Sequence, residues 1–255
     1  MKRFLSALLC AIVTMMTLPA QATRHTTCAA NPQRLAGTFV VDTINGVPCT
    51  VYLPHQYADR AGKEVFPVLY LQHGMFGNET DWKEKGNLLH WMDTLLRSGQ
   101  IIEMVVIMPD NCPSMPTYEE EKTNATSGSW EKNFANFMTE SERKYSISNQ
   151  PSKRAIAGLS MGGYHTMRVS SLLDGQFDYV GMFSPATFTH QAPSSPKVFM
   201  IAIGKDDFLY GSFLTYRRWL DSSHIEYTYY ESAGAHDWPN WQDYLCRFLK
   251  KFKPE

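Results

Sequence analysis

Three nearly continuous apolar runs constrain the fold of this chain more strongly than any other feature. They occupy residues 66–71, 104–108 and 198–203. Strands that are apolar at almost every position are typical of a parallel sheet covered by helices on both faces. Because helical patterns separate these runs, we expect one α/β domain with a mixed, mostly parallel sheet flanked by helices.

Weaker patterns complete this outline. Residues 37–41 and 50–53 flank Asn45-Gly46, a residue pair that predicts a β-hairpin ahead of the parallel strands. Shorter strands are expected at 155–157, 179–183 and 225–230. Apolar residues at helical spacing predict helices at 87–96, 131–145, 161–173, 213–220 and 241–252.

The longest segment without either pattern covers residues 109–129. It is rich in Pro, Ser, Thr, Asn and Glu, which are typical of irregular structure. Since a loop of this length in a single domain is often functional, we expect it to shape a binding site.

The first 22 residues have the pattern of a secretory signal peptide. Lys2 and Arg3 precede an apolar stretch over residues 4–18, and Ala20-Gln21-Ala22 offers a small-x-small cleavage site. A membrane anchor is the alternative, but the stretch is short for a hydrocarbon core of about 30 Å. We expect cleavage after Ala22, a secreted or periplasmic mature domain over residues 23–255, and no membrane segment within it.

Charge and cysteine content narrow the possible partners. Lys and Arg number 24 against 25 Asp and Glu, so there is no basic excess to support nucleic-acid binding. Export would leave Cys28, Cys49, Cys112 and Cys246 in an oxidising compartment, where they could form two disulfides in any of three pairings. Buried free thiols are the alternative. The irregular spacing of these four cysteines does not indicate a zinc site, and no metal or cofactor is expected.

Residues 158–162 read Gly-Leu-Ser-Met-Gly, a G-x-S-x-G motif. An apolar segment precedes it and a helical pattern follows it, which is the strand–turn–helix setting of a nucleophile elbow. Gly158 and Gly162 would let the strand and the helix pack closely around the turn. We therefore predict that Ser160 is a nucleophile.

A nucleophilic serine needs a base, and in this arrangement the histidine comes last in the chain. His236 lies in a loop of small residues before the final predicted helix, which could bring its imidazole over the elbow. His190 and His224 fit surface positions better, and His165 on the elbow helix fits a packing role. We predict that His236 is the base.

The acid that orients this histidine should follow the preceding strand. Residues 198–203 run into Gly204-Lys205-Asp206-Asp207, so either aspartate could serve. Phe208 and Leu209 after Asp207 would place that side chain inward, with Asp206 facing outward. We favour Asp207.

An oxyanion hole would stabilise the charge that develops on the carbonyl oxygen. The backbone N–H of Met161, directly after the serine, offers one donor. The strand over 66–71 leads into His73-Gly74-Met75-Phe76-Gly77, where the Met75 N–H is the expected second donor and the Phe76 N–H the alternative. His73 is expected to hold this loop by hydrogen bonding.

With these residues assembled, the chain resembles the esterase group of α/β-hydrolases of the carbohydrate esterase family one kind. The matching segments are Tyr70-Leu71-Gln72-His73-Gly74, Gly158-Leu159-Ser160-Met161-Gly162-Gly163, Gly204-Lys205-Asp206-Asp207-Phe208-Leu209 and Gly234-Ala235-His236-Asp237-Trp238-Pro239-Asn240-Trp241.

The resemblance implies an α/β-hydrolase fold and assigns Ser160, Asp207 and His236 as a catalytic triad, with Met75 and Met161 as oxyanion donors. Asp207 is the third residue after Gly204, as in the pattern of the group, which supports it over Asp206. The group also implies an aromatic wall near the site. Trp238 and Trp241 are candidates for substrate binding, with ordinary helix packing as the alternative.

The resulting expectation is a secreted serine carboxylic-ester hydrolase that works through an acyl-enzyme. By the resemblance, its substrates would be feruloyl or acetyl esters of carbohydrates, as small molecules or on polysaccharide. An acyltransferase with the same triad, a general short-chain esterase and a hydrolase-like binding module remain alternatives. Export argues against S-formylglutathione hydrolysis, and the sequence does not indicate an oligomeric state.

Overall fold

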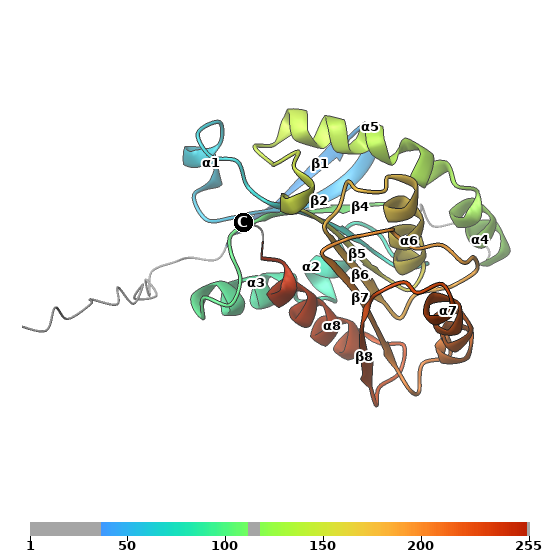
Figure 1. The fold of residues 1–255 in the computed structure, drawn as a ribbon. Helices are drawn as coiled ribbons and strands as arrows, with labels where there is room; N and C mark the ends of the chain where they lie inside the picture. Colours follow the sequence, from blue (N-terminus) through green and yellow to red (C-terminus); the bar gives the residue numbers. More distant parts are fainter. Residues whose placement is uncertain (1–36, 112–117, 254–255) are drawn as a thin grey trace, which may run out of the picture.

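An eight-stranded sheet runs through the molecule in the order β1-β2-β4-β3-β5-β6-β7-β8 (Figure 1). The structure is a computed structural model, and it describes residues 37–111 and 118–253. The strands are β1 Thr38–Ile44, β2 Val47–Leu53, β3 Val68–Gln72, β4 Val105–Pro109, β5 Arg154–Leu159, β6 Tyr179–Phe183, β7 Val198–Gly204 and β8 Thr228–Ser232.

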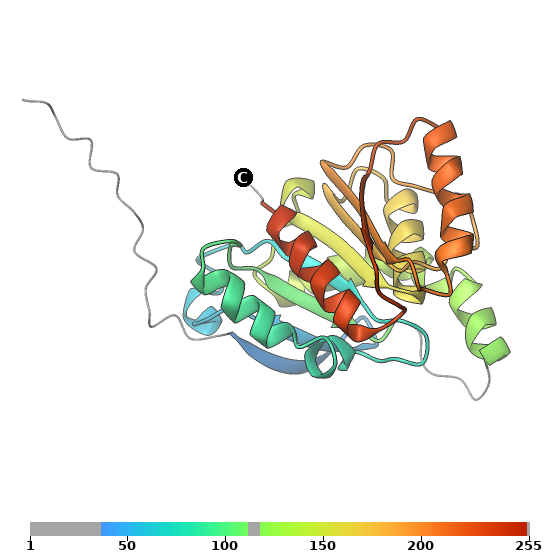
Figure 2. The ribbon, with the colours of Figure 1, turned by 90° about the horizontal axis from the view of Figure 1, so that it is seen from below.

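Helices cover both faces of this sheet. They are α1 Tyr57–Arg60, α2 Asp81–Glu84, α3 Leu88–Arg97, α4 Tyr118–Thr126, α5 Ser129–Lys144, the 3₁₀ turn η1 Pro151–Lys153, α6 Met161–Leu172, α7 Tyr210–Ser222 and α8 Trp238–Lys251. One apolar core joins the sheet to α5, α6 and α7, and the other joins it to α2, α3 and α8. Figure 2 shows α3 and α8 side by side over the second face.

The strand directions confirm the predicted α/β-hydrolase fold class. β1 and β2 form the expected antiparallel hairpin around Asn45-Gly46, and β2 pairs antiparallel with β4. All remaining neighbours are parallel, from β4 through β3, β5, β6 and β7 to β8. Every residue of β3, β4, β5 and β6 is buried, as continuous apolar strands covered on both faces require.

The expectation of an irregular loop over 109–129 is wrong in part, because α4 lies within it. That helix is almost entirely polar, so it carries no apolar periodicity that a sequence pattern could detect. The last strand is also shifted, from the expected 225–230 to Thr228–Ser232. The final helix begins at Trp238, three residues before the expected start at residue 241. The Asp237 side chain caps this end by accepting a hydrogen bond from the Asn240 N–H at 3.2 Å, and a proline lies in the first turn, where its missing N–H costs nothing.

Cys49 and Cys246 are buried free thiols, and burial raises the pKa of Cys49 to about 12. Cys28, Cys112 and the predicted signal peptide over 1–22 lie outside the described residues. Within 37–111 and 118–253, no helix is long and apolar enough to cross a bilayer. The same part of the chain contains no group of His, Cys, Asp and Glu side chains suited to a metal ion.

Candidate active site

Ser160 occupies the sharp turn between β5 and α6. Its backbone has φ 54° and ψ −117°, a conformation that a residue other than glycine rarely adopts. Two hydrogen bonds hold it there, from the Ser160 N–H to the Phe183 carbonyl at 2.8 Å and from the Ala186 N–H to the Ser160 carbonyl at 3.0 Å. The turn leaves Ser160 half-exposed at the carboxyl edge of the sheet.

The glycines on either side of the serine are required by close backbone contacts. A Cβ on Gly158 would lie 2.5 Å from the carbonyl oxygen of Gly162, and a Cβ on Gly162 would overlap the carbonyl oxygen of His73. Since backbone atoms cannot yield as a flexible side chain can, both positions must lack a side chain. These contacts bring β3, β5 and α6 together around Ser160.

We expect Gly158→Ala to lower the free energy of unfolding by about 2 to 3 kcal/mol, because the added methyl group forces the elbow apart. Gly211→Ala in α7 is the matched control, since a Cβ there meets nothing within 4 Å. That change should leave stability unchanged or raise it by up to about 1 kcal/mol, because alanine favours helix over glycine. Urea unfolding of both variants measures the difference, and equal stabilities would contradict the steric argument.

Three of the predicted site residues lie within hydrogen-bonding distance of one another. The His236 Nε2 is 3.0 Å from the Ser160 Oγ. The His236 Nδ1 is 2.8 Å from Asp207 Oδ2 and 3.0 Å from Asp207 Oδ1, so the Nδ1–H donates to the carboxylate. Asp207 follows β7, and His236 lies in the loop between β8 and α8. The parallel strands β5, β7 and β8 therefore place the serine, the carboxylate and the imidazole at the same edge of the sheet.

Asp207 is buried, whereas Asp206 is exposed, as the sequence predicted. Burial raises the pKa of Asp207, but hydrogen bonds from His236 and from the Leu209 N–H outweigh it, and the net pKa lies below its ordinary value. The carboxylate is therefore ionised at neutral pH. Phe208 does not account for the inward orientation of Asp207, because Phe208 is itself 76% exposed.

The loop after β3 lies directly against the serine. A Cβ on Gly74 would lie 3.2 Å from the Ser160 Cβ and 2.6 Å from the Leu159 Cδ1, so the loop approaches the elbow closely at this glycine. The His73 Nδ1–H donates to the Gly74 carbonyl at 2.7 Å, and its Nε2 accepts from the Asn111 N–H at 3.2 Å. His73 thus holds the loop by hydrogen bonding, as expected.

The two predicted oxyanion donors belong to this loop and to the elbow. Met161 is the first residue of α6, so its N–H has no acceptor within the helix. Met75 follows Gly74 and is half-buried, and Phe76 after it has φ 60°. The assignment of Met75 and Met161 as donors stays a prediction.

Trp241 and Trp238 lie beside the imidazole. The Trp241 ring meets the His236 ring edge-on, with centroids 4.9 Å apart, and only 7% of Trp241 is exposed. Trp238 is half-buried and packs edge-to-face against Trp82 and Trp241. Helix packing therefore accounts for most of the Trp241 surface, and substrate contact by either residue stays a prediction.

Sequence reasoning missed an exposed aromatic residue at the site. The Phe208 ring lies 4.4 Å from the His236 ring, on the outer side of the loop that carries Asp207. A large apolar side chain directly after the predicted acid was the available signal.

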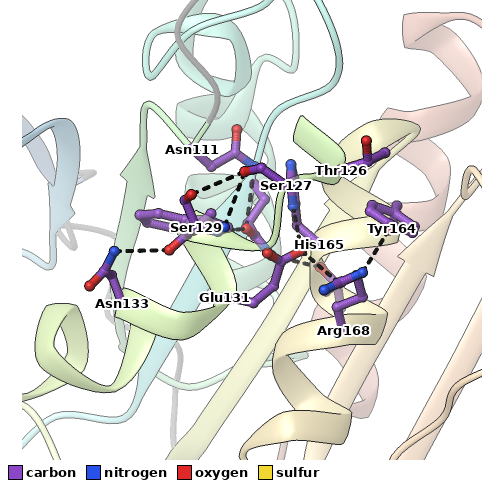
Figure 3. A network of polar contacts seen from close by, with 12 residues as sticks. Asn111, Thr126, Ser127, Ser129, Glu131, Asn133, Tyr164, His165 and Arg168 are labelled. Atoms are coloured by element: carbon purple, nitrogen blue, oxygen red, sulfur yellow. Dashed lines mark hydrogen bonds and ion pairs between the residues drawn. The ribbon is translucent and has the colours of Figure 1, made fainter. Parts of the chain in front are cut away.

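A second polar cluster is built around Glu131 of α5 and His165 of α6, the helix that begins directly after Ser160 (Figure 3). The His165 Nδ1 is 3.0 Å from Glu131 Oε1, and the Arg168 Nε is 3.1 Å from the same oxygen. Glu131 and His165 are buried. Burial raises the pKa of Glu131, but the hydrogen bond and the charge of His165 and the charge of Arg168 more than offset this, so its net pKa is lowered.

We expect Glu131→Gln to lower the free energy of unfolding at pH 7 by on the order of 3 kcal/mol, because it leaves buried partners without their carboxylate. The folded pKa of Glu131 lies below the unfolded value of 4.5, so its stabilisation is present above pH 4.5 and is lost as pH falls through the folded pKa. Urea unfolding from pH 7 downward should therefore show the difference shrink below pH 4.5.

The control for this variant is Glu140→Gln, which changes an exposed ion pair with Arg143 on the same helix. It should have a much smaller effect, because exposed pairs contribute little. A Glu131 effect that is small, or that does not change below pH 4.5, would contradict the argument.

Comparisons with known proteins agree on one family. Residues 45–222 match the family described as Putative esterase. An endo-1,4-beta-xylanase/feruloyl esterase of Xylanibacter ruminicola is 31% identical over 160 residues, which cover 58% of this chain and 20% of that protein. An acetyl esterase of Caldicellulosiruptor saccharolyticus is 25% identical over 239 residues, covering 72% of this chain and 82% of the relative.

The fold also matches solved structures. The ferulic acid esterase of the anaerobic fungus Anaeromyces mucronatus superimposes with a TM-score of 0.70 at 22% identity, over 86% of this chain and 92% of that one. At this identity the likeness shows a shared fold. The chain spans only a fifth of the length of the Xylanibacter relative, so what that whole protein does is not transferred by the match.

Proposed function

The chain belongs to the Putative esterase family, a group of serine esterases, and from this premise we propose that Ser160, His236 and Asp207 carry out carboxylic-ester hydrolysis here. One observation supports this assignment most strongly. The His236 imidazole lies between the Ser160 hydroxyl at 3.0 Å and the Asp207 carboxylate at 2.8 Å. A nucleophile, its base and a group that orients the base are the components of acyl transfer.

The reaction follows from these contacts. As the Ser160 Oγ attacks the ester carbonyl, the His236 Nε2 takes the hydroxyl proton and the Asp207 carboxylate stabilises the imidazolium. The tetrahedral intermediate collapses when His236 returns the proton to the leaving alcohol, which gives an acyl-enzyme on Ser160. Water, deprotonated by His236, then attacks the acyl group and releases the acid and the free serine.

In this proposal the Met75 and Met161 N–H groups stabilise the oxyanion of each tetrahedral intermediate. Support comes from the close approach of the Gly74 loop to Ser160 and from the position of Met161 at the start of α6. The helix terminus also favours negative charge beside the serine.

The proposed substrates are feruloyl or acetyl esters, because one relative is a xylanase/feruloyl esterase and the other an acetyl esterase. The resemblance to the carbohydrate esterase group extends the proposal to esters of carbohydrates. The exposed Phe208 ring beside His236 offers apolar surface for an aromatic acyl group. We further propose that residues 1–22 direct export and that residues 23–255 act outside the cytoplasm, where polysaccharide esters are accessible.

A fluorophosphonate probe tests the nucleophile, because it reacts only with an activated serine. We expect the probe to label Ser160, located by mass spectrometry of the digested protein, and His236→Ala to abolish that labelling. Absence of labelling in the folded wild-type protein would overturn the proposal. Rates on methyl ferulate, acetylated xylan and p-nitrophenyl esters of increasing chain length would then identify the acyl group.

A further inference from the structure

A cavity of about 460 Å³ lies next to the carboxyl edge of the sheet, outside the Ser160–His236–Asp207 site. Its walls come from the β1–β2 turn, from the residues after β4, and from α4, α5 and α6. This volume is within the range of small-molecule sites, about 300 to 1,000 Å³.

Three buried polar atoms of the lining residues have no hydrogen-bond partner within the described part of the chain. One is the Asp110 Oδ1, which lies 3.3 Å from the His73 Nε2. The others are the Asn111 Oδ1 and the His165 Nε2, the latter on a side chain that is 1% exposed. The Asn111 and His165 side chains are each held in place by their other polar atom. The His165 Nδ1 bonds to Glu131, and the Asn111 Nδ2 donates to the Gln72 Oε1 at 3.2 Å. Figure 3 shows His165 beside Glu131, with Asn111 and Ser127 nearby.

Buried polar atoms in proteins nearly always have a hydrogen-bond partner. Unpaired atoms on side chains that are held in place therefore indicate a ligand that supplies the missing hydrogen bonds. A hydroxyl group both donates and accepts, so it suits the amide oxygen of Asn111 and the imidazole nitrogen of His165 in either protonation state. Ser129 and Asn133 on α5 add further donors and acceptors to the same walls.

The remaining lining favours a neutral ligand. Among the described lining residues there is no lysine or arginine, and Asp110 contributes a carboxylate, so an anion would find no counter-charge. Trp130 and Phe137, with ring centroids 5.3 Å apart, supply an apolar part, and the Trp130 indole is fixed by donating to Gln72 Oε1 at 2.6 Å. A sugar ring combines hydroxyl groups with apolar C–H faces and matches this lining.

The cavity is joined to the reaction centre through the loop after β3. The Asn111 N–H donates to the His73 Nε2, and Gly74 next to His73 approaches the Ser160 Cβ. His165 itself lies five positions after Ser160 on α6. We propose that this cavity binds a neutral sugar unit of the ester substrate. The link to Ser160 rests on the proposed function, whereas sugar binding in the cavity does not.

The test titrates xylobiose into Ser160→Ala protein by calorimetry, so that hydrolysis cannot interfere. His165→Asn is added to this background because the asparagine amide can replace the Nδ1–H donor to Glu131 while removing the Nε2. We expect it to weaken xylobiose binding about tenfold, as loss of one good hydrogen bond would. Asn133→Ala, an exposed change on α5, should also weaken binding, and the matched Asn136→Ala on the same helix outside the cavity should not.

Kinetics on the wild-type background give a second measurement. The ratio of kcat/KM for feruloylated xylobiose to kcat/KM for methyl ferulate should fall about tenfold in His165→Asn and stay constant in Asn136→Ala. The proposal is overturned if xylobiose does not bind the Ser160→Ala protein, or if Asn133→Ala and Asn136→Ala behave alike. Full hydrolytic activity of Ser160→Ala would instead overturn the proposed function, and the titration would still decide whether the cavity binds sugar.

Discussion

Replacing Ser160 by alanine is expected to lower kcat for p-nitrophenyl acetate by about 10⁶-fold, the scale seen when a triad nucleophile is removed from a serine hydrolase. Without the Oγ no acyl-enzyme can form, and only direct attack by water remains. The proposed oxyanion donors, Met75 and Met161, are unchanged in this variant, so the residual rate should still exceed the uncatalysed rate by about 10³-fold or more. A steady-state assay on highly purified protein measures both the loss in kcat and the residual rate above the uncatalysed reaction.

The control for this variant is a double variant. Ser160 and His236 act as one unit through the 3.0 Å contact, so Ser160→Ala with His236→Ala should be no slower than Ser160→Ala alone. Circular dichroism and the Tm of each variant must match wild type, which excludes unfolding as the cause. Additive losses, or activity retained by the single variant, would be incompatible with the proposed mechanism.

Asp207→Asn is expected to lower kcat by about 10⁴-fold with little change in KM. The asparagine amide can place its NH₂ group against the His236 Nδ1. The imidazole then carries its proton on Nε2, and this nitrogen can no longer accept the proton of the Ser160 hydroxyl. It also removes the charge that stabilises the imidazolium. Because Asp207 has a lowered pKa in the folded protein, its carboxylate is ionised throughout the neutral range, and the loss should be present at every pH from 6 to 8.

The neighbouring aspartate provides a matched comparison. Asp206 is exposed and is one position from Asp207, so Asp206→Asn makes the same chemical change at the same loop without touching His236. Its kcat should stay within about twofold of wild type, as for most surface substitutions. If Asp206→Asn were the slower variant, the acid would have been assigned to the wrong residue.

The parts of this fold that depend on local signals were predictable from the sequence. Continuous apolar runs predicted β3, β4 and β7, and Asn45-Gly46 predicted the hairpin, because each depends on residues adjacent in the chain. The elbow was equally local, since Gly158 and Gly162 surround Ser160 within five residues. His236 needed the additional constraint of chain order, which separated it from the other histidines.

What the sequence did not reveal depends on contacts between distant segments. The Glu131–His165 pair joins residues 34 positions apart, and neither residue type signals a partner on its own. The cavity beside it requires five separate segments to meet. α4 could not be predicted from the sequence, because a polar helix that faces solvent has no periodic apolar face. Phe208 was misjudged because apolar character predicts burial on average, whereas its position beside His236 depends on how the loop after β7 turns.

The order of the candidate residues has a consequence for synthesis of the protein. His236 follows Ser160 and Asp207 along the chain and is held by the loop after β8, the strand at the edge of the sheet. Among the described strands, β8 pairs with β7 alone, so this loop is held over Ser160 when β8 lies beside β7. A growing polypeptide therefore contains Ser160 and Asp207 before it contains the proposed base. Under the proposed mechanism, a nascent chain that does not yet contain His236 would be inert toward esters.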